Sequence, residues 1–164
     1  MSYLDASGGR VLPTMSVPVP FVSVAATPTL DTAAYASGDS LHTAVIEFTG
    51  AVVGPGFSGF VESMTIVDRA VQSQPLELWL FSATVTPAAA NAAHSISDAD
   101  AATCIGVISS GPYYASALNS VSVAKGVNLP IKSAATSLFG ILVTRGAPTY
   151  AAGSLTVSLL ISQS

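Results

Sequence analysis

The chain has 164 residues, enough for one domain with a sizeable core and too few for two ordinary ones. Charged side chains make up only 9% of it, against about 25% in an average soluble protein, and this composition is typical of proteins that bury surface in subunit contacts. Five basic residues, scattered singly in a chain of net charge −4, argue against nucleic-acid binding, and the single cysteine excludes an intrachain disulfide.

Hydropathy indicates no membrane-spanning segment. The best candidate, residues 138–143, is bounded by Ser137 and Thr144, whereas a spanning helix needs about 20 apolar residues. Met1 is followed by Asp5 and two glycines rather than by a basic segment and an apolar core, so the pattern of a secretory signal is missing. We therefore expect synthesis in a cytoplasm and no membrane partner.

Residues 1–28 predict an extended N-terminal arm. Its four prolines remove ladder donors and keep their neighbours extended, which disfavours a helix or a central strand. A disordered tail would be polar, yet no charge lies between Arg10 and Asp31. We expect the arm to lie along its own domain or a neighbour, with these interface residues: Tyr3, Leu12, Met15, Val17, Val19 and Phe21.

Residues 29–164 predict a β-sandwich domain, because short segments of alternating apolar residues follow one another between Gly/Pro turns. The expected strands are residues 41–53, 59–69, 76–84, 104–109, 113–124, 136–145 and 154–161. Short turns between the first three predict two hairpins. In the last strand, Leu155, Val157, Leu159 and Ile161 alternate with Thr156, Ser158, Leu160 and Ser162.

The strand over residues 76–84 holds the only tryptophan and has two apolar faces, so it is predicted to be central. One face carries Leu76, Leu78 and Leu80, and the other carries Glu77, Trp79 and Phe81. We expect the opposing sheet to cover the Trp79/Phe81 face, with the arm or a neighbouring subunit closing the edge.

After Pro87 the alternation is lost until Cys104, and one short helix is predicted within this stretch. Ser97 is placed as the N-cap, with Asp98 and Asp100 in the first turn, where carboxylates favour the helix dipole. We call this long connection between two strands the excursion, and its length would suit a crossing between two sheets.

Together these elements predict an all-β fold, an antiparallel β-sandwich with almost no helix. Jelly-roll and immunoglobulin-like arrangements both fit the strand count, and the long excursion favours the jelly roll.

Catalytic motifs are missing from the sequence. A Ser-His-Asp hydrolase would need His42 or His94, but no Gly-x-Ser-x-Gly elbow is present. Asp98 and Asp100 beside His94 could hold a metal, although helix electrostatics explains both carboxylates. Cys104 is predicted at the start of a buried strand, as an inert hydrophobe. We expect no enzyme activity, no cofactor and no metal.

Three tyrosines in or near turns, Tyr113, Tyr114 and Tyr150, form a candidate ligand or partner surface. Exposed aromatic rings stack on sugars or fill a partner's pocket. Tyrosines at strand starts also serve in packing, and both interpretations stay open.

Three stretches, residues 28–39, 78–87 and 91–100, resemble small structural proteins of tailed bacteriophages that decorate or cement the capsid. The resemblance covers about residues 28–110. It implies a β-sandwich that oligomerises, expected as a homotrimer, on the major capsid protein of the virion, and that is made in the cytoplasm of the host bacterium. No catalytic residues are carried over. The alternative is a receptor- or carbohydrate-binding module of a tail, spike or fibre that uses the three tyrosines.

Overall fold

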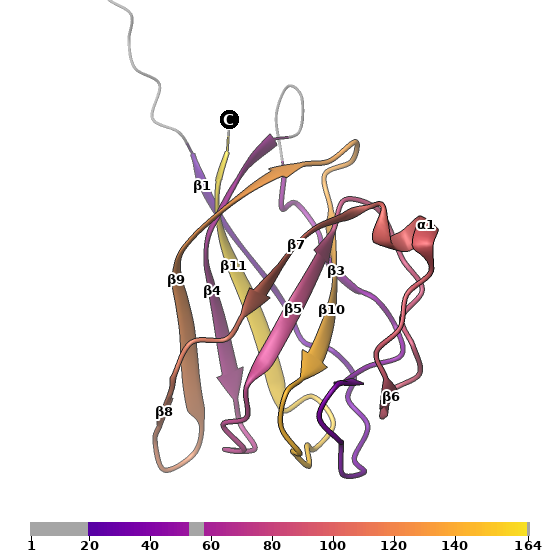
Figure 1. The fold of residues 1–164 in the computed structure, drawn as a ribbon. Coiled ribbons are helices and arrows are strands. Elements are labelled where there is room, and N and C mark those ends of the chain that lie inside the picture. The colour runs from indigo at the N-terminus through magenta and orange to yellow at the C-terminus, as the bar shows by residue number, and fades with distance from the viewer. Residues whose placement is uncertain (1–19, 53–57, 164) are drawn as a thin grey trace, which may run out of the picture.

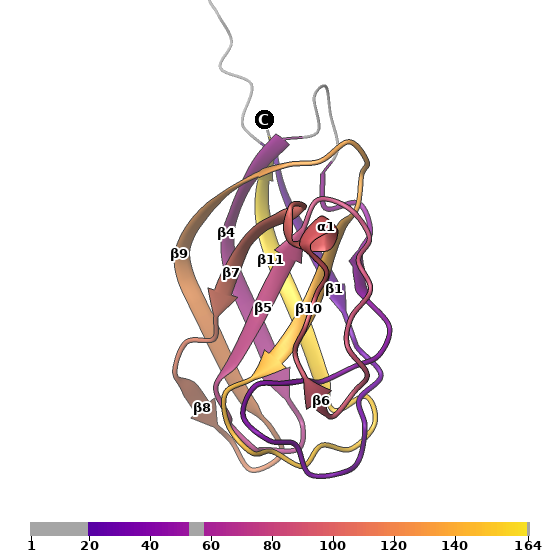
Figure 2. The same ribbon diagram turned by 45° about the vertical axis from the view of Figure 1, so that its right-hand side comes forward.

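The computed structural model describes residues 20–52 and 58–163, which form two antiparallel β-sheets packed on each other with one short helix outside them (Figures 1 and 2). The predicted all-β sandwich with one short helix is confirmed. Residues 1–19 of the predicted arm lie outside the described residues. None of the described helical segments has the length and apolar character needed to span a membrane.

The first sheet has five strands, and each neighbouring pair is antiparallel. Across the sheet, the order is β1 (Phe21–Ala26), β11 (Leu155–Gln163), β4 (Ser58–Asp68), β9 (Ser120–Lys132) and β8 (Tyr113–Ala115).

The second sheet has six strands and carries the helix α1 (Asp98–Ala101) on its outer side (Figure 2). Its order is β6 (Ala92–Ala93), β2 (Asp39–Ser40), β10 (Leu138–Thr144), β5 (Leu76–Phe81) and β7 (Cys104–Ser109), and β3 (Ile46–Phe48) also pairs with β10.

The chain changes sheet between β3 and β4 and again between β4 and β5, so the two predicted hairpins are wrong. Instead β4 pairs with β9 and β11, and β5 pairs with β10 and β7. The excursion, residues 82–103, joins the neighbouring strands β5 and β7 of one sheet, so it is not a crossing between sheets. A short turn can connect two neighbouring strands of one sheet, and it can equally connect a strand of one sheet to a strand of the other sheet. Turn length alone therefore does not predict a hairpin.

The main core lies between the two sheets and is built mainly from buried aliphatic side chains, with Phe48, Tyr35 and Tyr150 among them. Leu76, Leu78 and Leu80 of β5 belong to it. The alternation predicted for the last strand is confirmed, because all four inward residues of β11 are fully buried: Leu155, Val157, Leu159 and Ile161.

The Trp79/Phe81 face of β5 points away from the opposing sheet, so the cover predicted for it is wrong. A second hydrophobic cluster forms there from Phe81, Val85, Ile141 and Val143, with Trp79 and Ile96 packed against it. The excursion supplies Val85 and Ile96, and it therefore covers this face. The indole Nε1 of Trp79 donates to Glu77 on the same face at 3.4 Å.

The helix begins as the sequence predicts. Ser97 has an extended backbone, and its hydroxyl accepts from the Asp100 N–H at 3.1 Å. Asp98 and Asp100 lie in the first turn, where they favour the positive end of the helix.

Several element boundaries differ from the predictions. Residues 21–26 of the predicted arm form the edge strand β1, between Pro20 and Pro28, which is where a sheet tolerates proline. The predicted strand 113–124 is divided into β8 and β9 by a turn in which the Ser116 N–H donates to the Asn119 carbonyl at 2.7 Å. Strands β2 and β6 have two residues each, too few for a periodic signal.

Leu159→Ala should lower the free energy of unfolding by about 2–5 kcal/mol, because it opens a cavity between the sheets. Leu118→Ala, the same change in a side chain that is 81% exposed, should cost less than about 1 kcal/mol. Urea unfolding followed by tryptophan fluorescence measures both, and equal losses would contradict this location of the core.

Candidate interaction surface

His42 is a buried structural residue. Its Nε2 accepts from the Leu142 N–H at 2.9 Å, so Nδ1 carries the proton and donates to the Ala44 carbonyl at 2.6 Å. Burial lowers the pKa of His42, and the bond to Ala44 offsets part of this effect. Both ring nitrogens are therefore committed to the backbone.

His94 joins the excursion to the sheet. Its ring packs on Trp79 with centroids 4.8 Å apart, and Nδ1 lies 3.3 Å from the Ser40 hydroxyl. Ser40 is fully buried, so an external substrate does not reach this Ser-His contact. Burial, with a smaller effect of Arg145, lowers the pKa of His94. Within residues 20–52 and 58–163, no three His, Cys, Asp or Glu side chains are grouped to hold a metal.

The three candidate tyrosines do not share one surface. Tyr150 is buried and packs near Tyr35, with ring centroids 6.2 Å apart. Tyr113 is half-buried and packs against the main core, and burial raises the pKa of both Tyr113 and Tyr150. Tyr114, its neighbour on β8, is 70% exposed. The alternation of side chains along β8 explains the contrast between Tyr113 and Tyr114.

We name the outer surface of the five-stranded sheet the open face, because no described element packs over it (Figures 1 and 2). Strand register places Phe21, Ser162, Phe60 and Pro130 in one row across β1, β11, β4 and β9. Phe21 is 65% exposed and Phe60 is 47% exposed, and the exposed Leu160 and Tyr114 lie on the same face. Clustered exposed apolar side chains mark interaction sites in soluble proteins.

The open face also carries basic side chains, two on β9 and one next to the end of β4. Lys125 lies opposite Ser63, and Lys132 lies opposite Ser58. At the other end of the sheet, Arg69 donates to the Thr156 hydroxyl at 2.9 Å. One acid faces them, Glu62, which accepts from the Ser162 hydroxyl at 2.5 Å. The face is therefore mainly apolar and hydroxylic, with a positive balance.

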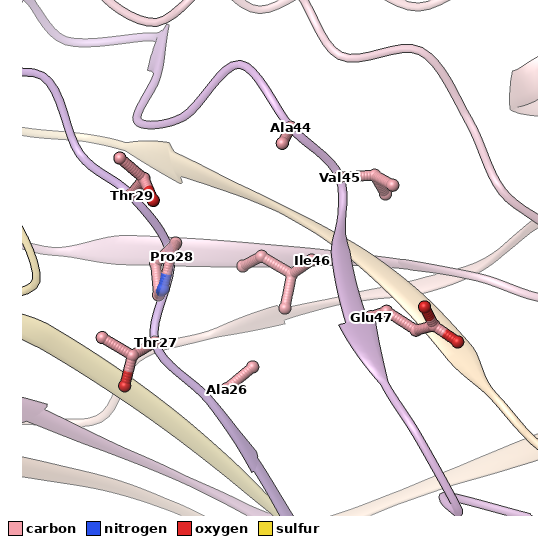
Figure 3. A pocket seen from close by; sticks show the side chains of 8 residues that line it. All are labelled: Ala26, Thr27, Pro28, Thr29, Ala44, Val45, Ile46 and Glu47. Atoms are coloured by element: carbon pink, nitrogen blue, oxygen red, sulfur yellow. The ribbon is translucent and has the colours of Figure 1, made fainter.

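Beside the open face, a pocket of about 260 Å³ lies between the end of β1 and the start of β3 (Figure 3). We call it the edge pocket. Residues 26–29 form one wall and residues 44–47 form the other. Figure 3 shows Ile46 projecting between the walls toward Pro28. Glu47 lies at the rim and accepts from the Ser137 hydroxyl at 2.7 Å. A second hollow adjoins the pocket at Thr29 and Ala44 and includes Asp31.

Strand β1 borders both the open face and the edge pocket. Its six residues carry no charge, and in the described part of the chain it pairs with β11 alone. Such an edge strand usually carries protection against association, and β1 has none in its own sequence. The predicted interface residue Phe21 lies on it, whereas the other five predicted arm residues lie outside the described residues.

Phe60 and Leu160 were missed as candidate residues, and the sequence held a signal for Leu160 alone. Leu160 is the apolar member of the polar side of β11, whereas Phe60 is in phase with the inward residues Met64 and Ile66 and faces outward because the strand register shifts between Val61 and Ser63. Pairing of strands distant in sequence was needed to bring the two together.

No protein-family model matches the chain, and no curated protein sequence matches it either.

Lowering the pH from 7.5 to 5 should destabilise the protein. The pKa of His42 is lower in the folded state than its ordinary value of 6.5. Below that value the unfolded chain takes up a proton that the folded chain excludes, so the free energy of unfolding falls. Chemical denaturation at each pH measures this slope.

His94 has a lowered pKa as well and adds a slope of the same sign, so His42→Asn should flatten the pH profile in part and His42→Asn with His94→Gln should flatten it further. A profile as steep in the double variant as in the original chain would contradict the assignment.

Proposed function

We propose that the sandwich is a jelly roll and that the chain is a virion structural protein. Eight strands of a jelly roll pair in a nested order: first with last, second with seventh, third with sixth and fourth with fifth. Leaving aside β8 and the two-residue strands β2 and β6, the observed pairs are β1 with β11, β3 with β10, β4 with β9 and β5 with β7. This nesting supports a jelly roll.

Jelly rolls recur in viral capsid and lectin domains, so the fold alone favours two classes of function. The open face is the observation that favours a structural role. An exposed sheet surface with Phe21, Phe60 and Leu160 and few charges suits a protein that works while bound to other protein surfaces.

The proposed role is that of a capsid decoration or cement protein. It binds the outside of a phage head as an oligomer, for which a homotrimer is the proposed form, and its direct partners are the major capsid protein and further copies of itself. The arm that precedes β1 grips the shell or the next subunit. The resemblance to phage decoration proteins and the low charge of the chain support this role.

A receptor- or carbohydrate-binding module of a tail, spike or fibre is the second candidate. It is favoured by the β8–β9 hairpin, where Tyr114 is 70% exposed and Leu118 is 81% exposed. Of the three tyrosines, Tyr114 has the exposure that sugar stacking requires. Binding to a glycan array that Tyr114→Ala removes, with few copies per virion, would favour this candidate.

The decoration role predicts that the full-length protein binds capsids of its phage that lack it, at hundreds of copies per particle. Val17→Asp with Val19→Asp should abolish this binding, since each change places a charge in the apolar arm. Cosedimentation with capsids measures the loss, and circular dichroism checks that the sandwich is folded.

Ser2→Asp is the matched control, because it adds a charge outside the proposed interface residues of the arm. Full binding by the Val17/Val19 variant would contradict the gripping role of the arm. No binding by the unchanged protein would contradict the decoration role itself.

A further inference from the structure

We propose that the chain associates with a second copy of itself by placing the open face against the edge pocket of the next copy, with the Phe60 ring in the pocket and the Phe21 ring on the surface beside it. This inference deepens the self-association in the proposed function and rests on it. The partner surface is a defined part of the same chain.

The aromatic pair is arranged as an anchor. Phe21 on β1 and Phe60 on β4 both lie opposite Ser162 of β11, so their Cα atoms are separated by two strand spacings, about 10 Å. Both side chains are exposed, Phe21 more than Phe60, on strands whose backbone is fixed by antiparallel pairing. Aromatic side chains held in this way lose little conformational freedom when they enter a partner's pocket.

The edge pocket is large enough for a phenyl ring. Its volume is about 260 Å³, and a cavity of about 150 Å³ is large enough for benzene. The pocket is open to solvent, and its lining mixes apolar and polar groups: Ala26, Thr27, Pro28, Thr29, Ala44, Val45, Ile46 and Glu47. Figure 3 shows short side chains along the wall of residues 26–29 and Ile46 projecting toward that wall from the other side.

Charge favours this pairing of different surfaces over the stacking of two open faces. The row of Phe60 is flanked on β9 by Lys125 and Lys132. Glu47 lies at the rim of the edge pocket, and Asp31 lines the adjoining hollow. Contact between the open face and the pocket brings opposite charges together, whereas two stacked open faces would bring lysines close to lysines.

The two surfaces are different parts of one chain, so the contact between copies is heterologous. Strand β1 carries Phe21 near one end and contributes Ala26 to the pocket at the other, so the surfaces share a strand. A contact between two different surfaces repeats from copy to copy and gives a ring such as a trimer when the rotation between copies closes, or an open filament when it does not. Five strands at about 4.8 Å spacing and four rows of outward residues give the open face roughly 500 Å² in projection, below the about 800 Å² that each partner contributes to a standard specific contact.

The experiment compares full-length variants by sedimentation velocity and light scattering. Phe21→Ser with Phe60→Ser removes the anchor, and Ala44→Trp fills the pocket. Each should raise the dissociation constant of the oligomer at least tenfold and shift the protein to monomers. Val107→Ser, a change of a 43% exposed side chain on β7 of the other sheet, is the control and should leave the oligomer unchanged.

A charge exchange tests which surfaces meet. Lys125→Glu with Lys132→Glu should weaken association, Glu47→Lys should weaken it as well, and the combination of all three should restore it in part. Restoration supports direct proximity of the two surfaces, because independent damage to each would add.

The inference is overturned if the original chain is monomeric, if the anchor variant stays oligomeric, or if the charge exchange gives additive losses. An anchor variant that stays oligomeric but no longer binds capsids would assign the open face to the capsid protein instead. An oligomer that behaves as predicted but does not bind capsids would uphold this interface and contradict the decoration role, so the two failures are distinct.

Discussion

The packing of the leucine face of β5 against the five-stranded sheet is the constraint on which the rest of the structure depends. Leu76, Leu78 and Leu80 share one buried core with Leu159 and its neighbours on β11. Because side chains alternate along a strand, burying the leucines forces Trp79 and Phe81 to the outside of the sheet. A strand with two apolar faces therefore requires a second cover, and a two-layer sandwich has no third sheet to provide it.

The excursion provides that cover. Phe81, Ile141 and Val143 are buried beneath it, and His94 fixes it by packing on Trp79. The capped helix α1 lies within the same segment and stops the chain from continuing as a strand. The excursion thus has a structural role. It connects the neighbouring strands β5 and β7 and covers the outer side of the six-stranded sheet.

The two outer surfaces of the sandwich consequently differ. One is covered from within the chain, while the other, the open face, keeps Phe21 and Phe60 exposed beside a positive balance of charge. With few charged residues in the chain, solubility cannot rest on a dense ionic surface, and clustered exposed apolar side chains such as those of the open face are typical of interaction sites. The asymmetry of the sandwich leads to the proposals on assembly, because an uncovered apolar face next to an edge pocket gives one chain two complementary surfaces.

The sequence by itself determined the all-β class, the inward side of β11, the apolar nature of both faces of β5 and the start of α1 at Ser97, because alternation and capping act between residues close in the chain. Tertiary structure alone decided which strands pair, which face of β5 meets the opposing sheet, and that Tyr150 is buried while Tyr114 is exposed. It also brought Phe21, Phe60 and Leu160 together from three distant strands. Strand partners are chosen by how the whole core closes, and no local pattern carries that information.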